Sequence, residues 1–337
     1  MQRGLFDWQF RLEKLDKNGD PLRHLNDVIP WQSFRPTLNT VREKVRKSNA
    51  GAKPYDVVMM FKILVIQSLY NLSDDAVEYQ IMDRISFMRF LGLNLGDRVP
   101  DAKTIWLFRE QLTKANLTKE LFNQFDHFLR NNGFAAQKGQ IVDASIVSAP
   151  KQRNSREDNK RINKGDIPED WNQAKRRQKD TDARWVKKMG KNHFGYKNHI
   201  NIDVKNKLIR DYDVTDAATH DSHVFDDLLD DTNTNRDVYA DSAYRSKDRS
   251  KILSKRGFRD RVQRKGYRHK KLTQREKHGN HTRSKTRCRV EHVFGVQAMM
   301  AGDLILRSIG ITRARAKIGL RNLAYNMFRY KTLATSG

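Results

Sequence analysis

The chain contains a single cysteine, Cys288, in 337 residues. One thiol excludes an intramolecular disulfide framework and is typical of a protein from a reducing compartment. Long hydrophobic runs are also missing. The most apolar stretch, residues 57–69, is interrupted by Lys62, and it is shorter than the roughly 20 apolar residues that span a bilayer. The residues after Met1 show no apolar core of a signal peptide. We therefore expect a cytoplasmic protein with no membrane partner.

Acidic residues are few compared with basic ones. The chain has 66 Lys and Arg against 40 Asp and Glu, a formal net charge of +26 and a pI near 10.1. This excess goes far beyond what solubility requires and favours a polyanionic partner, nucleic acid above all. On charge alone, a ribosome-associated or membrane-surface protein stays open. With 37% hydrophobic residues, a chain of this length buries a substantial core, and we expect two or three domains.

The spacing of apolar residues divides the chain into regions. Residues 1–50 are weakly patterned and interrupted by three prolines, and we assign this N-terminal extension no role. Residues 51–134 carry apolar side chains at helical spacing and predict an all-helical domain. Helices joined by short turns are used to read DNA, so this domain is a candidate for binding DNA ends, although a plain helical bundle is the commoner meaning. The expected helices start at Pro54, at the N-cap Ser73, near Asp101 and at Thr118, and the second and fourth end at Gly92 and Gly133.

The pattern changes to that of strands at Gly139, and it predicts an α/β domain over residues 135–337. Residues 151–191, with 14 Lys and Arg against 7 Asp and Glu, predict a basic insertion that is in part disordered. The order of elements favours a ribonuclease H-like mixed sheet flanked by helices, with three antiparallel strands followed by parallel ones. The expected elements are a strand around Asp143, a hairpin of residues 194–204 and 208–215, a helix from Asp221 through Leu228, a strand ending at Asp241, a helix to about Lys255, a short strand at 258–262, and helices over residues 283–291 and 312–330.

Three acids stand on separate elements of this domain. Asp143 lies in a β-branched strand, Asp241 at the carboxyl end of another strand, and Glu291 on a late helix. Cleavage of a phosphodiester with metal requires such acids to converge, and hard cations such as Mg²⁺ prefer carboxylate oxygens. Each acid taken alone also has an ordinary structural explanation. These are a bond from Asp143 to its own backbone, an N-cap at Asp241, and a helical ion pair between Glu291 and Arg287.

The segment between the last two acids holds much of the charge. Residues 242–289 contain 19 Lys and Arg against 3 acids, a net charge of 19 − 3 = +16. A solvated surface is the usual explanation for a charge run, whereas a metal site for DNA requires a surface that grips the backbone. A zinc set of His278, His281, Cys288 and His292 is a weaker alternative, because only six residues separate His281 from Cys288.

These motifs resemble those of the DDE transposases of bacterial insertion sequences, most closely the insertion-sequence-five group. The resemblance runs from about residue 54 to the end of the chain. It rests on the strand around Asp143, on Phe194-Gly-Tyr-Lys-Asn-His199, on Thr219-His-Asp221, on Asp241-Ser-Ala-Tyr-Arg-Ser246, and on Arg287 four residues before Glu291. The wider family often has Tyr three residues before the Arg and Lys seven after the Glu. Here those positions are Ser284 and Ala298, which weakens a role for this helix in orienting DNA.

The resemblance implies that Asp143, Asp241 and Glu291 form a metal-binding catalytic triad for Mg²⁺, with Mn²⁺ able to substitute and no small-molecule cofactor. It implies a bacterial, nucleoid-associated enzyme that binds the double-stranded ends of its element, cleaves there by attack of water, and joins the freed 3′-hydroxyl to target DNA. A homodimer or larger assembly on DNA would handle both ends. The side chains that we expect to contact DNA are Arg287, Arg245, Arg289, Lys197 and Tyr244. Tyr244 would stack on bases, and packing in the protein core is an equally open alternative for this side chain.

Two other functions stay open from the sequence. The first is a DNA-binding protein without catalysis, such as a repurposed transposase that acts as a repressor. The second is a related nuclease that cuts DNA without joining it. Retention of all three acids disfavours the first.

Overall fold

The computed structural model describes residues 7–42, 53–188, 190–302 and 304–335. The chain folds into two compact units. A helical unit comprises Met1–Phe125 together with Leu320–Gly337, and a sheet unit comprises Asp126–Gly319. The last helix and the helix at residue 125 therefore each contribute to both units.

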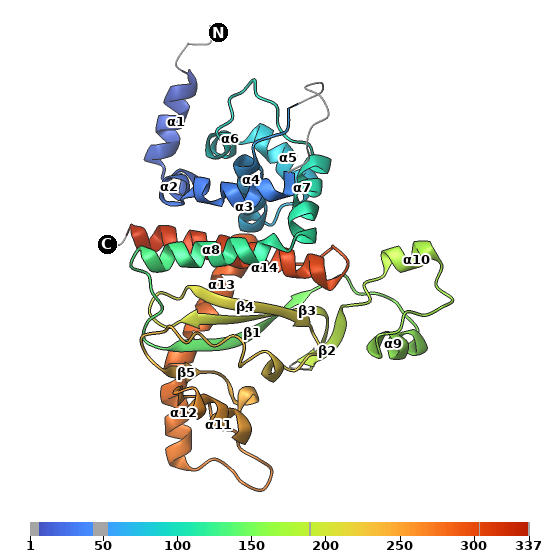
Figure 1. The fold of residues 1–337 in the computed structure, drawn as a ribbon, viewed down its shortest axis with the longest axis vertical. Helices are drawn as coiled ribbons and strands as arrows, with labels where there is room; N and C mark the ends of the chain where they lie inside the picture. The colour runs from blue at the N-terminus through green and yellow to red at the C-terminus, as the bar shows by residue number, and fades with distance from the viewer. Residues whose placement is uncertain (1–6, 43–52, 189, 303, 336–337) are drawn as a thin grey trace. The chain divides into compact units, whose positions relative to one another are not determined.

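The helical unit is built around α4 (Val57–Tyr70), which is buried on almost all sides. Asp56 begins this helix by accepting hydrogen bonds from the backbone N–H groups of Val58 and Met59, so Pro54 lies ahead of the helix and not in its first turn. Figure 1 shows the other helices of the unit. They are α1 (Asp7–Lys17), α2 (Pro21–Val28), α3 (Arg35–Asn39), α5 (Asp74–Asp83), α6 (Ile85–Leu91), α7 (Ala102–Lys114), most of α8 (Leu117–Asn131) and the end of α14 (Ile311–Ala334), with 3₁₀ turns η1 (Trp31–Phe34) and η2 (Thr40–Arg42).

Residues 7–42, to which the sequence assigned no role, complete the core of this unit. The Trp31 ring meets the ring of Phe61 edge-on, with 6.1 Å between centroids. Phe34 packs on the same Phe61 at 5.1 Å. Both N-terminal side chains are almost fully buried. This segment is thus part of the helical unit. It packs through a few buried side chains such as Trp31 and Phe34, although the sequence there shows only weak apolar periodicity.

The helix predicted from Ser73 to Gly92 is in fact two helices, and that prediction is wrong in this respect. Ser73 does cap α5, but Arg84 adopts an extended conformation between α5 and α6. The Arg84 guanidinium lies over the ring of Phe87 at 5.1 Å, and the break allows α6 to bury Phe87 and Phe90. No single helix among the described residues is long and apolar enough to cross a membrane; only α4 and α5 together pass that test, with a bend of 102° between them.

The sheet unit contains the predicted mixed sheet. Strand β3 pairs antiparallel with β1, β2 and β4, whereas β1 pairs parallel with β5, and β5 parallel with β6. The predicted hairpin and the change from antiparallel to parallel strands are therefore confirmed. The strands are β1 (Gln140–Ser148), β2 (Arg184–Lys188), β3 (Lys191–Asp203), β4 (Ile209–Asp216), β5 (Asp237–Tyr239) and β6 (Arg259–Asp260).

Gly195 explains part of the motif that begins at Phe194. It pairs with Ser148 of β1 and with Arg184 of β2. A Cβ at this position would stand 2.2 Å from the carbonyl oxygen of Val147, and the φ of +151° suits glycine. The glycine is required because three strands approach one another closely here.

Helices cover the sheet (Figure 1), where α13 (Arg289–Ala301) packs against β1 and α12 (Gln274–Arg287) against β5. The predicted helix over residues 283–291 is thus split between α12 and α13, with Cys288 at the junction. The predicted helix from residue 312 is α14, and α11 (Lys247–Lys255) follows the strand that leads to Asp241. A cluster of buried side chains fills one part of the core: Val142, Val224, Phe225, Leu228, Leu229, Val238, Ala240, Tyr244, Leu253, Phe258 and Val262.

Two expectations for this unit are wrong. The insertion at 151–191 is ordered over most of its length. It forms α9 (Arg156–Asn163), α10 (Gln173–Gln178) and strand β2, and it buries Ile162 and Trp171. The helix predicted from Asp221 is only a 3₁₀ turn, η3 (Asp221–His223). Arg249 and Arg256 donate hydrogen bonds to carbonyls of this stretch, so their side chains take acceptors that an α-helix would use.

Candidate functional site

The register of the two central parallel strands places two of the predicted acids side by side. In β1 and β5, Gln140 is opposite Val238 and Ile141 opposite Tyr239. Continued by two residues, this register sets Asp143 of β1 opposite Asp241, which lies just beyond the end of β5. Asp241 also caps the 3₁₀ turn η4 (Ser242–Tyr244) by accepting a hydrogen bond from the N–H of Ala243 at 2.7 Å. Its cap role and its position beside Asp143 coexist.

The carboxylate of Asp143 is mostly withdrawn from solvent, with 17% of the side chain exposed. One oxygen accepts a hydrogen bond from the N–H of Ala144, and the other accepts one from Arg287 at 2.8 Å. The pKa of Asp143 is raised to about 6, chiefly by burial and to a smaller extent by the Asp241 carboxylate, against the opposing effects of the Ala144 N–H and Arg287. A strand acid with this environment holds its charge only with help from neighbouring cations.

Arg287 joins Asp143 to the third predicted acid. The second nitrogen of its guanidinium lies 3.2 Å from Glu291 in the first turn of α13, one helical turn further on. Glu291 is 64% exposed, whereas Arg287 is only 22% exposed. The predicted helical ion pair therefore exists, but the same arginine also bonds an acid 144 residues away. One cation is shared by carboxylates from two different elements.

The oxygen donors suit a divalent cation, although Arg287 now holds two of them. In the described part of the chain, no group of three His, Cys, Asp or Glu side chains is arranged to hold a metal ion. The Arg287 guanidinium bridges Asp143 and Glu291 and partly compensates their negative charge. A donor set made only of carboxylates fits Mg²⁺ or Mn²⁺ and does not fit zinc, which prefers nitrogen and sulfur.

Comparison with known proteins identifies the family. A family model described as "Transposase DDE domain" matches residues 135–327, more than half of the chain. The chain belongs to the DDE transposase family. A second model, "Transposase domain (DUF772)", matches residues 10–111 of this family member, which includes much of the helical unit. Among solved structures, the chain is similar to a cryo-EM structure of the piggyBac transposase synaptic complex with hairpin DNA. The identity is 12% and the TM-score 0.49, over 94% of this chain and 76% of that one.

In this DDE-family chain, the prediction that Tyr244 stacks on DNA bases is wrong for the conformation described. The side chain is 1% exposed and belongs to the buried cluster of the sheet unit. Its ring lies 5.2 Å from that of Phe225. The sequence placed an aromatic residue in a basic segment, but the turn after Asp241 directs it into the core.

The other predicted DNA contacts lie near the carboxylates and have partners inside the protein. Lys197 bonds the carboxylate of Asp221 and a backbone carbonyl. Arg245 forms an ion pair with Asp260 at 2.8 Å. Arg289 donates to the backbone carbonyl of Val204. These side chains stabilise the turns and strands around the acids, and their contact with DNA stays a prediction.

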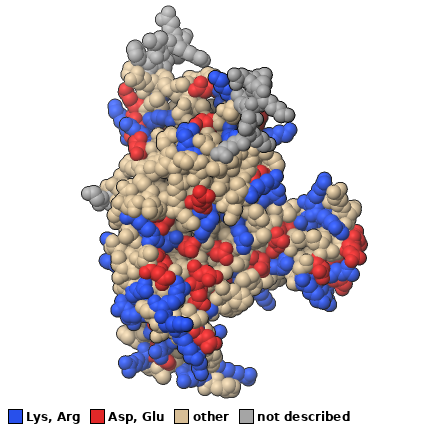
Figure 2. All heavy atoms as spheres, viewed as in Figure 1, with Lys and Arg blue, Asp and Glu red and all other residues tan. Residues whose placement is uncertain are grey.

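A second set of cations is more accessible, and the sequence did not single out its members. They lie on α12, labelled in Figure 1, and on the loop before it. Blue side chains gather in this region in Figure 2. All are exposed, and none forms an ion pair or a side-chain hydrogen bond with another residue that the structure describes. The sequence signal that finds them is a high density of Lys and Arg over residues 265–285, where Glu276 is the one acid. This set, called the basic arm below, comprises Lys265, Arg268, Lys270, Lys271, Arg275, Lys277 and Lys285.

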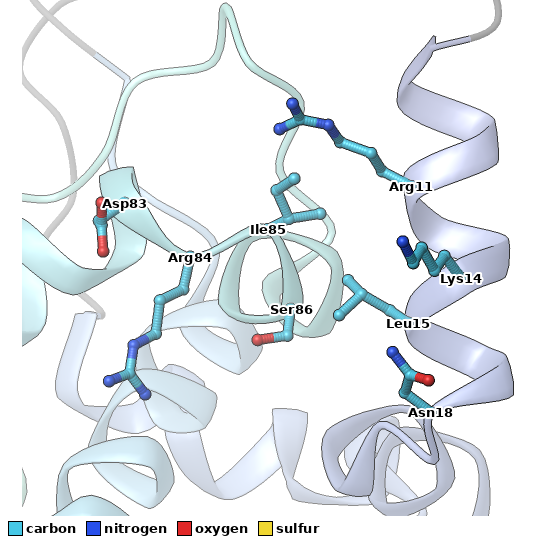
Figure 3. Close-up of a pocket in the computed structure, with 8 residues that line it drawn as sticks. All are labelled: Arg11, Lys14, Leu15, Asn18, Asp83, Arg84, Ile85 and Ser86. Carbon is cyan, nitrogen blue, oxygen red and sulfur yellow. The ribbon is translucent and has the colours of Figure 1, made fainter.

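The zinc alternative finds no geometric support among the residues described, since His278, His281, Cys288 and His292 form no metal-binding group. Cys288 is exposed and its thiol bonds the carbonyl of Lys285. A pocket of about 410 Å³ lies between α1 and the start of α6 in the helical unit (Figure 3). Its lining includes Leu15 and Ile85 but none of the predicted site residues.

Proposed function

We propose that the chain is the transposase of a bacterial insertion sequence of the insertion-sequence-five group. In this proposal it binds the ends of its element and catalyses metal-dependent DNA cleavage and strand transfer. Asp143, Asp241 and Glu291 are the catalytic carboxylates. Membership of the DDE transposase family supports the general activity, and the residue assignment rests on the local geometry.

The observation that carries the assignment is the position of the two strand acids. Asp143 lies in β1 and Asp241 lies just beyond the neighbouring parallel strand β5. Burial is the main cause of the raised pKa of Asp143, and the charge of Asp241 adds to it. Two ionised carboxylates in a mostly buried position repel each other unless a cation lies between them. Arg287 supplies part of that compensation, and it also reaches Glu291.

The three carboxylates would hold Mg²⁺, or Mn²⁺ in its place. When bound, the metal supplies Lewis acidity to the phosphodiester and lowers the pKa of the attacking water. The contribution of the chain is to hold the acids on defined elements, Asp143 within a strand, Asp241 just after a strand and Glu291 on a helix. When Arg287 moves away from Asp143 and Glu291, the carboxylate oxygens that it holds can bind the metal. The guanidinium can then bind a DNA phosphate one helical turn from the site.

The reaction has two steps at the same carboxylates. In the first, water adds to the phosphorus at an element end and the 3′-oxygen of the element leaves with a proton, which gives a free 3′-hydroxyl and a 5′-phosphate. In the second, that 3′-hydroxyl oxygen forms a bond to a target phosphorus, and the target 3′-oxygen departs. The numbers of phosphodiester bonds made and broken in the second step are equal, so no external energy source is required.

The basic arm is proposed to hold the DNA backbone. Seven exposed cations on α12 and the preceding loop lie on the segment between Asp241 and Glu291. Lys and Arg that neutralise phosphates release counterions, so such a surface binds DNA strongly and without sequence preference. The helical domain predicted at residues 51–134 is proposed to read the element ends. A homodimer or larger assembly would engage two ends in the bacterial nucleoid.

One observation favours the alternative of a DNA-binding protein that does not cut. Arg287 bridges Asp143 and Glu291, and no described set of three acids is arranged around a metal. If Arg287 never leaves, the acids are structural and the protein binds DNA without chemistry. A nuclease that cuts but does not join is separated from the transposase only by the second step.

The test is strand cleavage and transfer on labelled DNA that carries the element ends, with Mg²⁺ or Mn²⁺. We expect nicked products with 3′-hydroxyl ends and then joined products, both lost in Asp241→Ala. Full activity of Asp241→Ala would exclude the assignment of the triad. Tight DNA binding by the unmutated protein without cleavage would support the repressor, and cleavage without joining would support the nuclease.

A further inference from the structure

The hydroxyl of Tyr244 is buried without a partner. The side chain is 1% exposed, and its oxygen has no hydrogen-bond partner among the residues that the structure describes. A buried hydroxyl that donates to nothing destabilises a fold, whereas phenylalanine of the same shape does not. A tyrosine at this position therefore calls for an acceptor that becomes available in another state of the site.

The ring that carries this hydroxyl is held firmly. The turn η4 (Ser242–Tyr244), which Asp241 caps, packs against the turn η3. The Arg249 guanidinium ties the two turns together by donating to the carbonyls of Tyr244 and Ser222. It also lies over the ring of Phe225 at 5.0 Å, which in turn packs on Tyr244. The hydroxyl thus has a fixed position relative to the turn that Asp241 caps.

Three carboxylates lie close enough to Tyr244 for their charges to affect its pKa. Burial raises the pKa of Tyr244 well above its usual value, and the nearby charges of Asp143, Asp221 and Asp241 raise it further. The hydroxyl consequently keeps its proton at neutral pH and is a hydrogen-bond donor. Asp221 is already paired with Lys197 at 2.8 Å. Asp143 is engaged by Ala144 and Arg287, and its oxygen that bonds Arg287 becomes an available acceptor when the guanidinium leaves.

We propose that Tyr244 is a positioning residue whose hydroxyl donates a hydrogen bond to the Asp143–Asp241 carboxylate pair once Arg287 has given way to the divalent cation. The donor orients the carboxylates and offsets part of their mutual repulsion. Partners of this kind, one bond removed from a metal, typically change metal affinity or activity about 10–100-fold when they are lost. The inference rests on the proposed function, and it reassigns Tyr244 from base stacking to support of the carboxylates.

The test uses the full chain and compares Tyr244→Phe with a matched control, Tyr239→Phe. Tyr239 lies on β5 two residues before Asp241 and its hydroxyl is 3.5 Å from Asp237. Free Mn²⁺ is counted by electron paramagnetic resonance to give an apparent Kd, and the urea midpoint is measured without metal. We expect Tyr244→Phe to bind Mn²⁺ about 10–100-fold more weakly, with a urea midpoint equal to or above that of the unmutated protein. Tyr239→Phe should leave both values unchanged.

Two results would overturn this role. Unchanged Mn²⁺ affinity in Tyr244→Phe would show that the hydroxyl is merely tolerated. A marked fall in the urea midpoint without metal would show that it has a structural partner in the metal-free fold. Asp241→Ala serves to separate the two levels of the proposal. If Asp241→Ala binds Mn²⁺ as tightly as the unmutated protein, the carboxylate site itself is wrong, and the role of Tyr244 fails with it.

Discussion

The cations near the carboxylates and the cations of the basic arm differ in what they contact. Lys197, Arg245 and Arg249 each bond acids or carbonyls of the sheet unit. The basic arm projects from α12 and its preceding loop, and its side chains are exposed. Charge of the same sign therefore serves two purposes. The first group stabilises turns and strands of the sheet unit around the acids. The second is exposed, and we propose that it contacts phosphates of DNA.

Arg287 stands between the two groups. It bonds Asp143 and Glu291 as the inner cations do, but it lies at the end of α12, the helix that carries much of the basic arm. A cation in this position can respond to both metal and DNA. Variants of the acids, the arm and Arg287 should consequently separate chemistry, binding and the exchange between them.

The largest effect is expected at the acids. Asp241→Ala should reduce strand cleavage on the order of a thousandfold or more, because the metal loses a ligand at the reacting phosphate. DNA affinity should change little. The matched control is Asp248→Ala, which removes one exposed carboxylate from α11 and so has the same net charge as Asp241→Ala. Equal losses of cleavage in both variants would show that charge, and not the position of Asp241, matters.

The basic arm should affect binding and not chemistry. Replacing four of its lysines by glutamine should weaken DNA binding on the order of a hundredfold near 0.1 M salt, and lower the slope of log affinity against log salt by roughly 3–4. Saturating DNA should restore most of the cleavage rate. The variant comprises Lys265→Gln, Lys270→Gln, Lys271→Gln and Lys277→Gln.

A control with the same net charge removes four exposed lysines from the insertion and from β2. If this control weakens binding as much as the arm variant does, the DNA contacts are spread over the whole surface and the contrast between the two groups of cations disappears. The control comprises Lys151→Gln, Lys160→Gln, Lys164→Gln and Lys187→Gln, all at exposed positions.

The exchange at Arg287 should give an effect of intermediate size. In Arg287→Ala, the carboxylates no longer have to break charge-assisted hydrogen bonds before they bind metal, so at pH 8 without DNA the affinity for Mn²⁺ should rise about tenfold. Arg287→Lys keeps the positive charge but not the two-pronged guanidinium that bridges both acids, so it should show a smaller rise in Mn²⁺ affinity. Isothermal titration calorimetry measures both. Weaker Mn²⁺ binding in Arg287→Ala would mean that the arginine orders the acids and does not compete for them.

The smallest expected effect is on stability without metal. The pKa of Asp143 is about 6 in the fold against 3.8 for an unperturbed Asp carboxyl, so the folded state binds more protons between these pH values. The contribution of protonated Asp143 to the free energy of unfolding is fully present below about pH 4, and it is lost as the pH rises through about 6. Relative to Asp143→Asn, the unmutated protein should lose roughly 1–3 kcal/mol between pH 4 and 7. Calorimetric Tm values of both proteins measure this, and parallel curves would contradict it.

The sequence predicted the sheet more fully than the surroundings of its acids. Alternating and β-branched runs identified the hairpin and the strand that leads to Asp241, since the same periodicity sets both burial and pairing. The register of β1 and β5, which the sequence did not predict, brings Asp143 beside Asp241. Residues 221–228 were mistaken for helix because Arg249 and Arg256, distant in sequence, bond the carbonyls of Ser222 and Asp226.

The roles of individual cations depended on contacts that a sequence does not display. Nothing local distinguishes Arg245, paired with Asp260, from Arg268, which is exposed. The burial of Tyr244 depends on the turn that Asp241 caps and on the ring of Phe225. Charge counts identified the basic segment as a whole, but tertiary contacts decide which of its side chains face solvent.

Anomalous diffraction from crystals of the full chain soaked in Mn²⁺ would show directly whether the acids exchange Arg287 for a metal. We expect a manganese peak in contact with carboxylate oxygens of Asp143 and Asp241, with the Arg287 guanidinium displaced from Asp143. An absent peak at saturating Mn²⁺, with Arg287 still bridging Asp143 and Glu291, would contradict the exchange and the metal site with it.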